Sequence, residues 1–86
     1  MQKKVVYSFE YEFTDFDAAL DEIKKITAEI DEIEIEVTFK ERLSFFTINK
    51  VFESVERFMK YAEAIKVLAE HGDVHSVEIT VYLKQT

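Results

Sequence analysis

The sequence predicts an α+β fold in which one four-stranded antiparallel sheet carries two helices on one of its faces. Four segments alternate apolar and polar residues, as half-buried strands do, and two segments repeat apolar residues every three to four positions, as amphipathic helices do. These segments follow one another in the order βαββαβ. With 86 residues, 48% of them hydrophobic, the chain can form one core, so residues 1–86 are expected to be a single domain.

The first half of the chain predicts a strand, a helix and a second strand. Residues 5–13 alternate in polarity and are rich in valine and aromatic residues, which is typical of a strand. Thr14 stands three residues before Asp17, as in a capping box, and apolar residues at helical spacing then predict a helix over residues 15–31. Residues 33–40 alternate again and predict the second strand.

The second half repeats this order after a short link at Glu41 and Arg42. Residues 43–48 predict a third strand with apolar residues on both faces. Asn49 is a good helix N-cap, and a wide apolar stripe predicts a helix over residues 50–71. Gly72, the single glycine, stands where a left-handed residue would end that helix, and residues 76–83 predict the fourth strand.

This order of elements predicts a ferredoxin-like two-layer sandwich with strand order 4-1-3-2. Each helix serves as a right-handed crossover, and the short link between the second and third strands predicts a hairpin. The first and third strands are then central, and the second and fourth strands are the edges of the sheet. A fold of this kind is shared by proteins of many functions, so it indicates no activity.

Charge and composition exclude several classes of function. Eighteen acidic residues against eleven basic ones give a net charge of −7, which argues against binding of nucleic acid or of an anionic membrane surface. Cysteine is absent, which excludes disulfides and thiolate metal sites. The N-terminal residues lack the apolar run of a signal peptide, and no stretch approaches the length of a membrane span. We therefore expect a cytoplasmic protein.

Proline is absent and glycine occurs once, so no linker or glycine-rich phosphate loop is present in the sequence. A natural gene of phage-like or AT-rich origin would fit this composition. A de novo designed sequence built from strong helix and strand formers would fit it as well. The link at Glu41 and Arg42 favours the natural origin, because a designer would place glycine, asparagine or aspartate there.

No catalytic, cofactor or metal residues are predicted. His71 and His75 are four residues apart, but Gly72 breaks the helix between them, and a third convincing ligand is missing. Glutamates on an open sheet face lack the apolar pocket that a general acid requires. RNA-recognition domains share the predicted topology, but residues 42–48 lack their glycine and their alternating aromatic residues.

The uncovered face of the sheet is the predicted partner-binding surface. Strand polarity places aromatic and basic residues at one end of this face and acidic residues at the other, and an exposed aromatic residue rimmed by charge can anchor a protein contact. The candidate residues are Val6, Phe45, Phe46, Tyr82, Glu10, Glu12, Glu34, Glu36 and Glu78.

The function that follows is a non-catalytic domain, either an artificial scaffold or a small protein-interaction module with a protein partner. The alternative is an acidic inhibitor that mimics nucleic acid. Thr80 and Tyr82 give the fourth strand a lightly charged edge, so the protein is expected to be a monomer or a weak homodimer paired through that strand.

Overall fold

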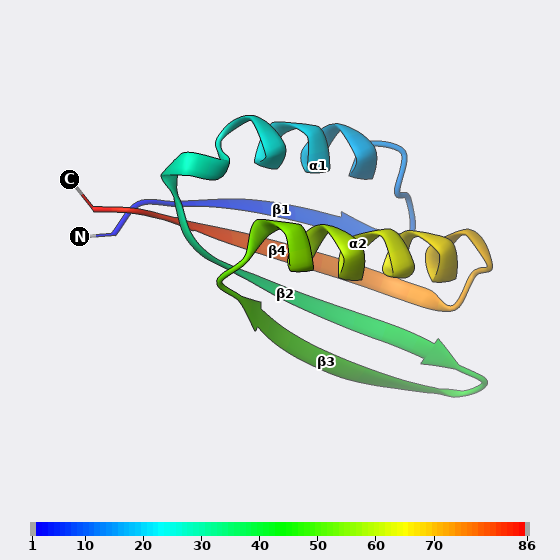
Figure 1. Cartoon of the computed structure of the whole chain (residues 1–86). Coiled ribbons are helices and arrows are strands. Elements are labelled where there is room, and N and C mark those ends of the chain that lie inside the picture. Colours follow the sequence, from blue (N-terminus) through cyan, green and yellow to red (C-terminus); the bar gives the residue numbers. More distant parts are fainter. Residues whose placement is uncertain (1, 86) are drawn as a thin grey trace.

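A computed structural model of the chain describes residues 2–85, and it confirms an α+β fold with four antiparallel strands and two helices (Figure 1). The elements are β1 (Lys4–Glu10), α1 (Phe16–Lys25), a 3₁₀ turn η1 (Thr27–Glu29), β2 (Ile30–Glu41), β3 (Ser44–Phe52), α2 (Val55–Glu70) and β4 (Val74–Leu83). Both helices lie on the same face of the sheet. Within residues 2–85, no helix is long and apolar enough to cross a membrane.

The strand order is β1-β4-β2-β3, so the predicted order 4-1-3-2 is wrong. Every neighbouring pair is antiparallel, and β4 lies between β1 and β2. The edges are therefore β1 and β3, and not the second and fourth strands. Because β4 has a hydrogen-bonded neighbour on both sides, it is not the free edge on which the expected homodimer through the fourth strand depended: its Thr80 and Tyr82 pair with β1 and β2 inside the sheet.

Lys50 gives a physical reason for the position of β3 at an edge. The register pairs Lys50 with Ile35 and Phe52 with Ile33, so Lys50 lies on the sheet face that the helices cover. A central strand would bury its ammonium group under the helices, which is costly without a partner. At the edge, Lys50 remains exposed, and its Nζ atom lies 5.3 Å from the centre of the Tyr61 ring.

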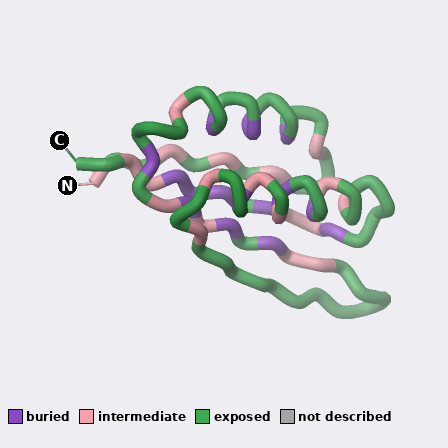
Figure 2. Tube along the Cα trace, viewed as in Figure 1, coloured by how far each residue is buried: buried purple, intermediate pink, exposed green. Residues whose placement is uncertain are grey.

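The core lies between the two helices and the central strands. Ile33, Ile35, Val37, Val77, Ile79 and Val81 form its sheet side, and Phe16, Leu20, Ile23, Phe58, Ala62 and Ile65 form its helix side. Figure 2 shows this buried set in β2, β4 and the inner sides of the helices, whereas β3 is exposed along almost its whole length. The alternation of polarity in the second and fourth predicted strands is thereby confirmed.

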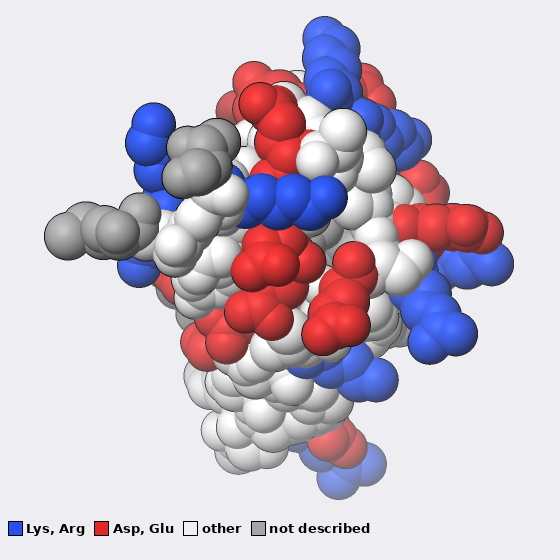
Figure 3. Space-filling view, turned by 60° about the vertical axis from the view of Figure 1, so that its left-hand side comes forward, with Lys and Arg blue, Asp and Glu red and all other residues white. Residues whose placement is uncertain are grey.

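Charge is unevenly spread over the surface. In the view of Figure 3, acidic side chains gather in the middle, and most lysine and arginine side chains lie around them. The area at the bottom, at the height of β3 in Figure 1, is largely uncharged. The β3 strand itself has a single charged residue, Lys50.

The first strand ends at Glu10 and does not continue to residue 13. Tyr11 has a φ of 66°, in the left-handed region, and this residue turns the chain out of the strand. Tyr11 is consequently 75% exposed, whereas Phe13 packs with Phe9 and Phe16 beneath α1. The predicted alternation placed Tyr11 in the core, and the turn moves it to the surface.

The first helix is shorter than the predicted range of residues 15–31. It ends at Lys25, where the Ile26 N–H donates to the Ile23 carbonyl and the Thr27 hydroxyl donates to the Lys24 carbonyl at 2.8 Å. Two consecutive β-branched residues at this point weaken the helix. Residues 30–32 instead begin β2, where Ile30 pairs with Leu83 of β4.

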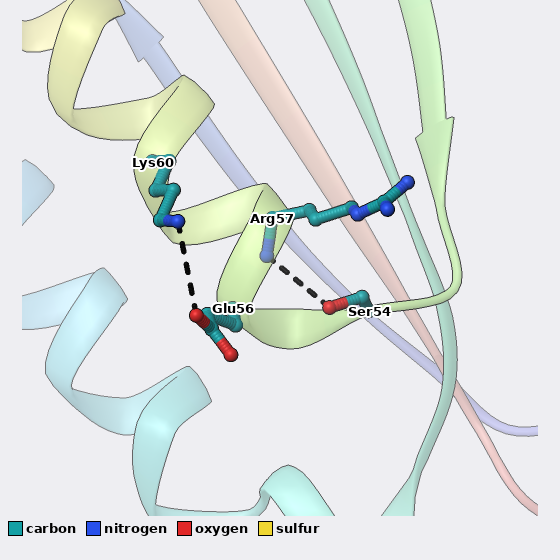
Figure 4. Close-up of polar contacts among 4 residues, drawn as sticks. All are labelled: Ser54, Glu56, Arg57 and Lys60. Atoms are coloured by element: carbon teal, nitrogen blue, oxygen red, sulfur yellow. Dashed lines mark hydrogen bonds and ion pairs between the residues drawn. The ribbon is translucent and has the colours of Figure 1, made fainter.

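The second helix begins at Val55, and the predicted N-cap at Asn49 is wrong. Residues 49–52 pair with β2 and extend β3 to Phe52. Ser54 is the N-cap, and its hydroxyl accepts a hydrogen bond from the Arg57 N–H at 3.2 Å (Figure 4). In the same turn, Glu56 and Lys60 form an exposed ion pair at 3.8 Å.

Gly72 follows the end of α2 in a left-handed conformation, as the sequence predicts. Its φ is 81°, the left-handed conformation that glycine adopts without steric cost. The Gly72 N–H donates to the Ala69 carbonyl, and the Asp73 N–H donates to the Leu68 carbonyl at 3.1 Å. This pair of bonds is a Schellman motif, which satisfies carbonyl groups of the last helical turn.

Candidate protein-binding surface

The sheet face opposite the helices, called the open face here, is covered by no other element of the described chain (Figure 1). The registers between the strands decide which residues lie on it. They are Lys4, Val6, Ser8 and Glu10 of β1, Tyr82, Thr80, Glu78 and Ser76 of β4, Glu32, Glu34, Glu36, Thr38 and Lys40 of β2, and Val51, Asn49, Thr47 and Phe45 of β3.

Four glutamates form an acidic band across the middle of the open face: Glu10, Glu34, Glu36 and Glu78. Glu36 of β2 lies directly opposite Glu78 of β4, so the two side chains start about 5 Å apart. Glu10 joins them around a shallow hollow that Ser8 and Ser76 also line. Like charges placed opposite each other destabilise a sheet slightly, and a cation between them would remove that cost.

A row of aromatic rings lies beside the acidic band, at the end of the open face near the hairpin loop. The ring of His75 is 4.9 Å from that of Tyr11 and 4.8 Å from that of Phe45. These three residues, called the aromatic row here, come from the turn after β1, from β4 and from β3. Lys40 pairs with Phe45 and adds a positive charge at this end.

A β-bulge places His75 in this row. The partner of Thr38 is Ser76, but the partner of Phe39 is Val74, so His75 is an extra residue in β4. Bulges redirect side chains in this way. The sequence predicted neither Tyr11 nor His75 as surface residues of this kind: strict alternation assigned Tyr11 to the core, and no residue pattern signals the bulge.

The structure separates some of the predicted binding residues. Val6 and Tyr82 lie on the open face but at the end opposite to Phe45, and Glu34 is in the same cross-strand row as Val6. The predicted division into one aromatic and basic end and one acidic end is therefore wrong. Its cause is the strand order: β3 lies at the far edge and runs antiparallel to β1, so the start of β3 lies at the end of the sheet opposite to Val6.

Two further predicted residues lie outside the open face. Phe46 pairs with Phe39 on the helix side of the sheet, where the two rings stack 5.1 Å apart, and it is 45% exposed because no helix covers this part of β3. Glu12 follows the end of β1, exposed, with its N–H donating to the Glu10 carbonyl. The open face thus keeps Val6, Phe45, Tyr82, Glu10, Glu34, Glu36 and Glu78 of the predicted set.

The two histidines have separate environments. The Nδ1 atom of His71 lies 2.9 Å from the Val67 carbonyl at the end of α2, while His75 lies in the aromatic row. Within residues 2–85, no group of three or more histidine, aspartate and glutamate side chains is placed to hold a metal ion.

The titratable groups with shifted pKa values lie on the helix side of the molecule. Burial raises the pKa of Tyr7, and its hydroxyl also donates to a Glu22 carboxylate oxygen at 2.9 Å. Burial likewise raises the pKa of Tyr61. A hydrogen bond from Lys66 to Asp17 at 2.8 Å raises the pKa of Lys66 and links α2 to α1. These groups stabilise the packing of the helices, and none belongs to the open face.

The open face thus combines solvated carboxylates with exposed rings on a flat support, which suits binding by charge and stacking. The hollow within the acidic band is shallow and lies among glutamate and serine side chains, unlike the enclosed apolar pocket that would hold a catalytic carboxyl group protonated. No protein-family model matches the chain, and no curated protein is significantly similar to it.

Proposed function

We propose that this protein is a non-catalytic interaction domain that binds a basic polypeptide segment on its open face. The observation that carries the proposal is the position of the acidic band beside the aromatic row, on a face that no other described element covers. A partner with lysine or arginine next to an aromatic residue would satisfy both features at once.

The energetic basis lies in the two like charges that the fold places opposite each other. Glu36 lies opposite Glu78, and the Asn49 side-chain amide donates a long hydrogen bond of 3.4 Å to the Glu36 carboxylate. A lysine or arginine side chain between them would relieve their repulsion and form two charged contacts. Tyr11 and Phe45 offer ring faces to a cation or a second ring beside them.

The backbone favours an interaction module over an artificial scaffold. Tyr11 and Arg42 adopt left-handed conformations, with φ values of 66° and 51°, although neither is glycine or asparagine. Idealised designs avoid such residues because each costs about 1–2 kcal/mol. Strain of this kind is typical of a sequence in which some residues serve a purpose other than stability.

The carboxylates of β2 support the second candidate, an inhibitor that mimics nucleic acid. Glu32, Glu34 and Glu36 follow one another at alternate positions of β2, so their side chains repeat about every 6.7 Å along one line. A regular row of negative charges resembles a phosphate backbone. In this case the partner would be a nucleic-acid-binding protein, and its binding to this domain and to DNA or RNA would be mutually exclusive.

A pair of charge-reversal variants tests the proposed surface. Glu36→Lys with Glu78→Lys changes the open face, and Glu56→Lys with Glu63→Lys makes the same change of net charge on the exposed side of α2. Titration with a lysine- and arginine-rich peptide that contains tryptophan should give salt-sensitive binding to the wild type and to the α2 variant. The open-face variant should bind at least about tenfold more weakly.

Equal losses of affinity in the two variants would show that net charge alone attracts the peptide, and would contradict the proposed surface. A competition experiment separates the two candidates. For a protein partner isolated from cells, an added DNA or RNA duplex would displace the domain if it is a nucleic-acid mimic, and would leave an ordinary protein complex intact.

A further inference from the structure

We infer that two copies of this chain pair through β3, antiparallel and centred on Ile48, and so form one continuous eight-stranded sheet. The edge formed by β3 is a separate feature from the binding surface proposed on the open face. The exposure of β3, the direction of its backbone groups and the self-complementarity of its sequence support this pairing.

The β3 strand is a long, uncovered and nearly uncharged edge. All of its residues except Phe52 are exposed, and Phe45, Val51 and Ile48 are 56%, 55% and 38% exposed. Lys50 is its single charged residue. Edges of this kind are templates for pairing with another strand unless a proline, a bulge or a charge blocks them. The β3 strand contains no proline and no bulge.

The backbone of β3 has free hydrogen-bonding groups along its outer side. The hairpin loop has two residues, so the flanking pair Glu41 and Ser44 is hydrogen-bonded, and such pairs alternate along the ladder. Ser44, Phe46, Ile48, Lys50 and Phe52 therefore direct their backbone groups towards β2. Phe45, Thr47, Asn49 and Val51 direct theirs outwards, where a second strand can bond to them.

A two-fold axis at Ile48 pairs each of the nine residues of β3 with a residue of the second copy. On the open face, Phe45 then lies opposite Val51, and Thr47 lies opposite Asn49. On the helix side, Ile48 lies opposite its own copy. The pairs Phe45–Val51 and Thr47–Asn49 are those with outward backbone groups, so each free N–H and C=O of the strand gains a partner.

Charges are also complementary in this register. Lys50 lies opposite Phe46, and its own copy is about 13 Å away along the sheet, so the two ammonium groups do not oppose each other. Arg42 of one hairpin loop comes beside Glu53 of the other copy, because Leu43 is opposite Glu53 in the continued register. The symmetry produces this attraction twice.

The other edge of the sheet does not offer the same fit. Beside β1 lies a hollow that α1 and its N-cap also line, with Glu22 and Asp15 among the lining residues. Pairing two β1 strands would bring these carboxylates near those of the second copy. We therefore assign the self-association to β3 alone.

The absence of cysteine from the chain allows a direct test of the register. Sedimentation equilibrium of the wild type should show a concentration-dependent dimer, and a monomer at about 1 mM chain would overturn the inference. Under mild oxidation, Ile48→Cys should form a disulfide-linked dimer at least about tenfold faster than Val6→Cys, a matched change at an exposed position of β1.

Two further variants fix the register. Phe46→Cys and Lys50→Cys should each crosslink slowly alone, and a mixture of the two should crosslink rapidly, since each residue faces the other across the axis. Circular dichroism confirms that each variant is folded. Rapid crosslinking of Lys50→Cys alone, or equal rates for Ile48→Cys and Val6→Cys, would overturn the pairing.

Discussion

Three residues with left-handed backbone conformations set the ends of elements in this protein. Gly72 ends α2, Tyr11 ends β1, and Arg42 begins the two-residue loop between β2 and β3. Gly72 was predictable because glycine is the residue that this conformation favours. Tyr11 and Arg42 were not, because a tyrosine within a polarity alternation and an arginine in a short link carry no signal for a positive φ.

Substitutions at Gly72 should depend on backbone conformation alone, since an added Cβ atom would meet no heavy atom within 4 Å. Gly72→Val should lower the free energy of unfolding by about 2 kcal/mol, because a β-branched residue tolerates a φ of 81° poorly. Gly72→Asn should lower it by less than about 1 kcal/mol. Urea melts measure both values, and equal losses would contradict the left-handed assignment.

Arg42→Gly should stabilise the protein. The substitution removes a left-handed cost of about 1–2 kcal/mol, and the greater entropy of the unfolded chain offsets part of it, so we expect a net gain of about 0.5 kcal/mol. Glu41→Gly, one residue earlier in β2, should lower the stability by about 0.5–1 kcal/mol. The measurement is again a urea melt, at a concentration low enough to keep the chain monomeric. Destabilisation by both variants would show that Arg42 is not strained.

At the scale of elements, hydrophobic periodicity predicted every strand and helix, but several of their ends were predicted wrongly. The ends depend on partners that periodicity does not show. Residues 49–52 contain a good N-cap, yet they extend β3 because β2 offers them a ladder of partners. Residues 26–31 continue the helical spacing, yet Ile30 begins β2 because β4 is long enough to pair with it.

The faces of β2 should differ sharply in their tolerance of charge. Ile35 is fully buried, so Ile35→Lys places an unpaired ammonium group in the core and should cost more than about 3 kcal/mol. Glu36→Lys should change the free energy of unfolding by less than about 1 kcal/mol, and in the stabilising direction, because the new charge faces Glu78. Denaturant melts of the two variants give the comparison, and similar losses would contradict the register of β2.

The contact between Tyr7 of β1 and α1 should make the protein sensitive to alkali. Burial and the hydrogen bond to Glu22 raise the pKa of Tyr7 above its ordinary value of 10.0 in the folded state. The unfolded chain therefore releases this proton at a lower pH, and the free energy of unfolding falls as the pH rises through 10. Tyr7→Phe should reduce the loss of stability between about pH 9 and 11. An unchanged loss in this variant would exclude Tyr7 as its source.

At the scale of the whole molecule, the strand order decides which side chains meet. A sheet with β1 and β3 in its centre would separate Glu36 from Glu78, whereas the observed order places them opposite each other. Local patterns predict which face of a strand is buried, but not which strands are neighbours. The residue that indicates the edge position of β3 is Lys50, and it could serve as a signal only once it was known to lie in a strand.

The candidate surface was likewise predictable in its residues but not in their arrangement. The choice of the open face and most of its residues followed from the polarity of the strands, and the structure places seven of the nine predicted residues there. Their arrangement into an acidic band and an aromatic row could not be predicted, because it depends on the neighbours of β4 and on the bulge at His75.

Nuclear Overhauser contacts between backbone protons test the strand order, on which the acidic band, the aromatic row and the free β3 edge all depend. We expect Glu78 to show contacts with Ser8 of β1 on one side and with Glu36 of β2 on the other. The outer side of β3 should show contacts with no other strand of the same molecule, which a mixture of labelled and unlabelled chains distinguishes from contacts between copies. Backbone contacts between β1 and β3 within one molecule would contradict this account.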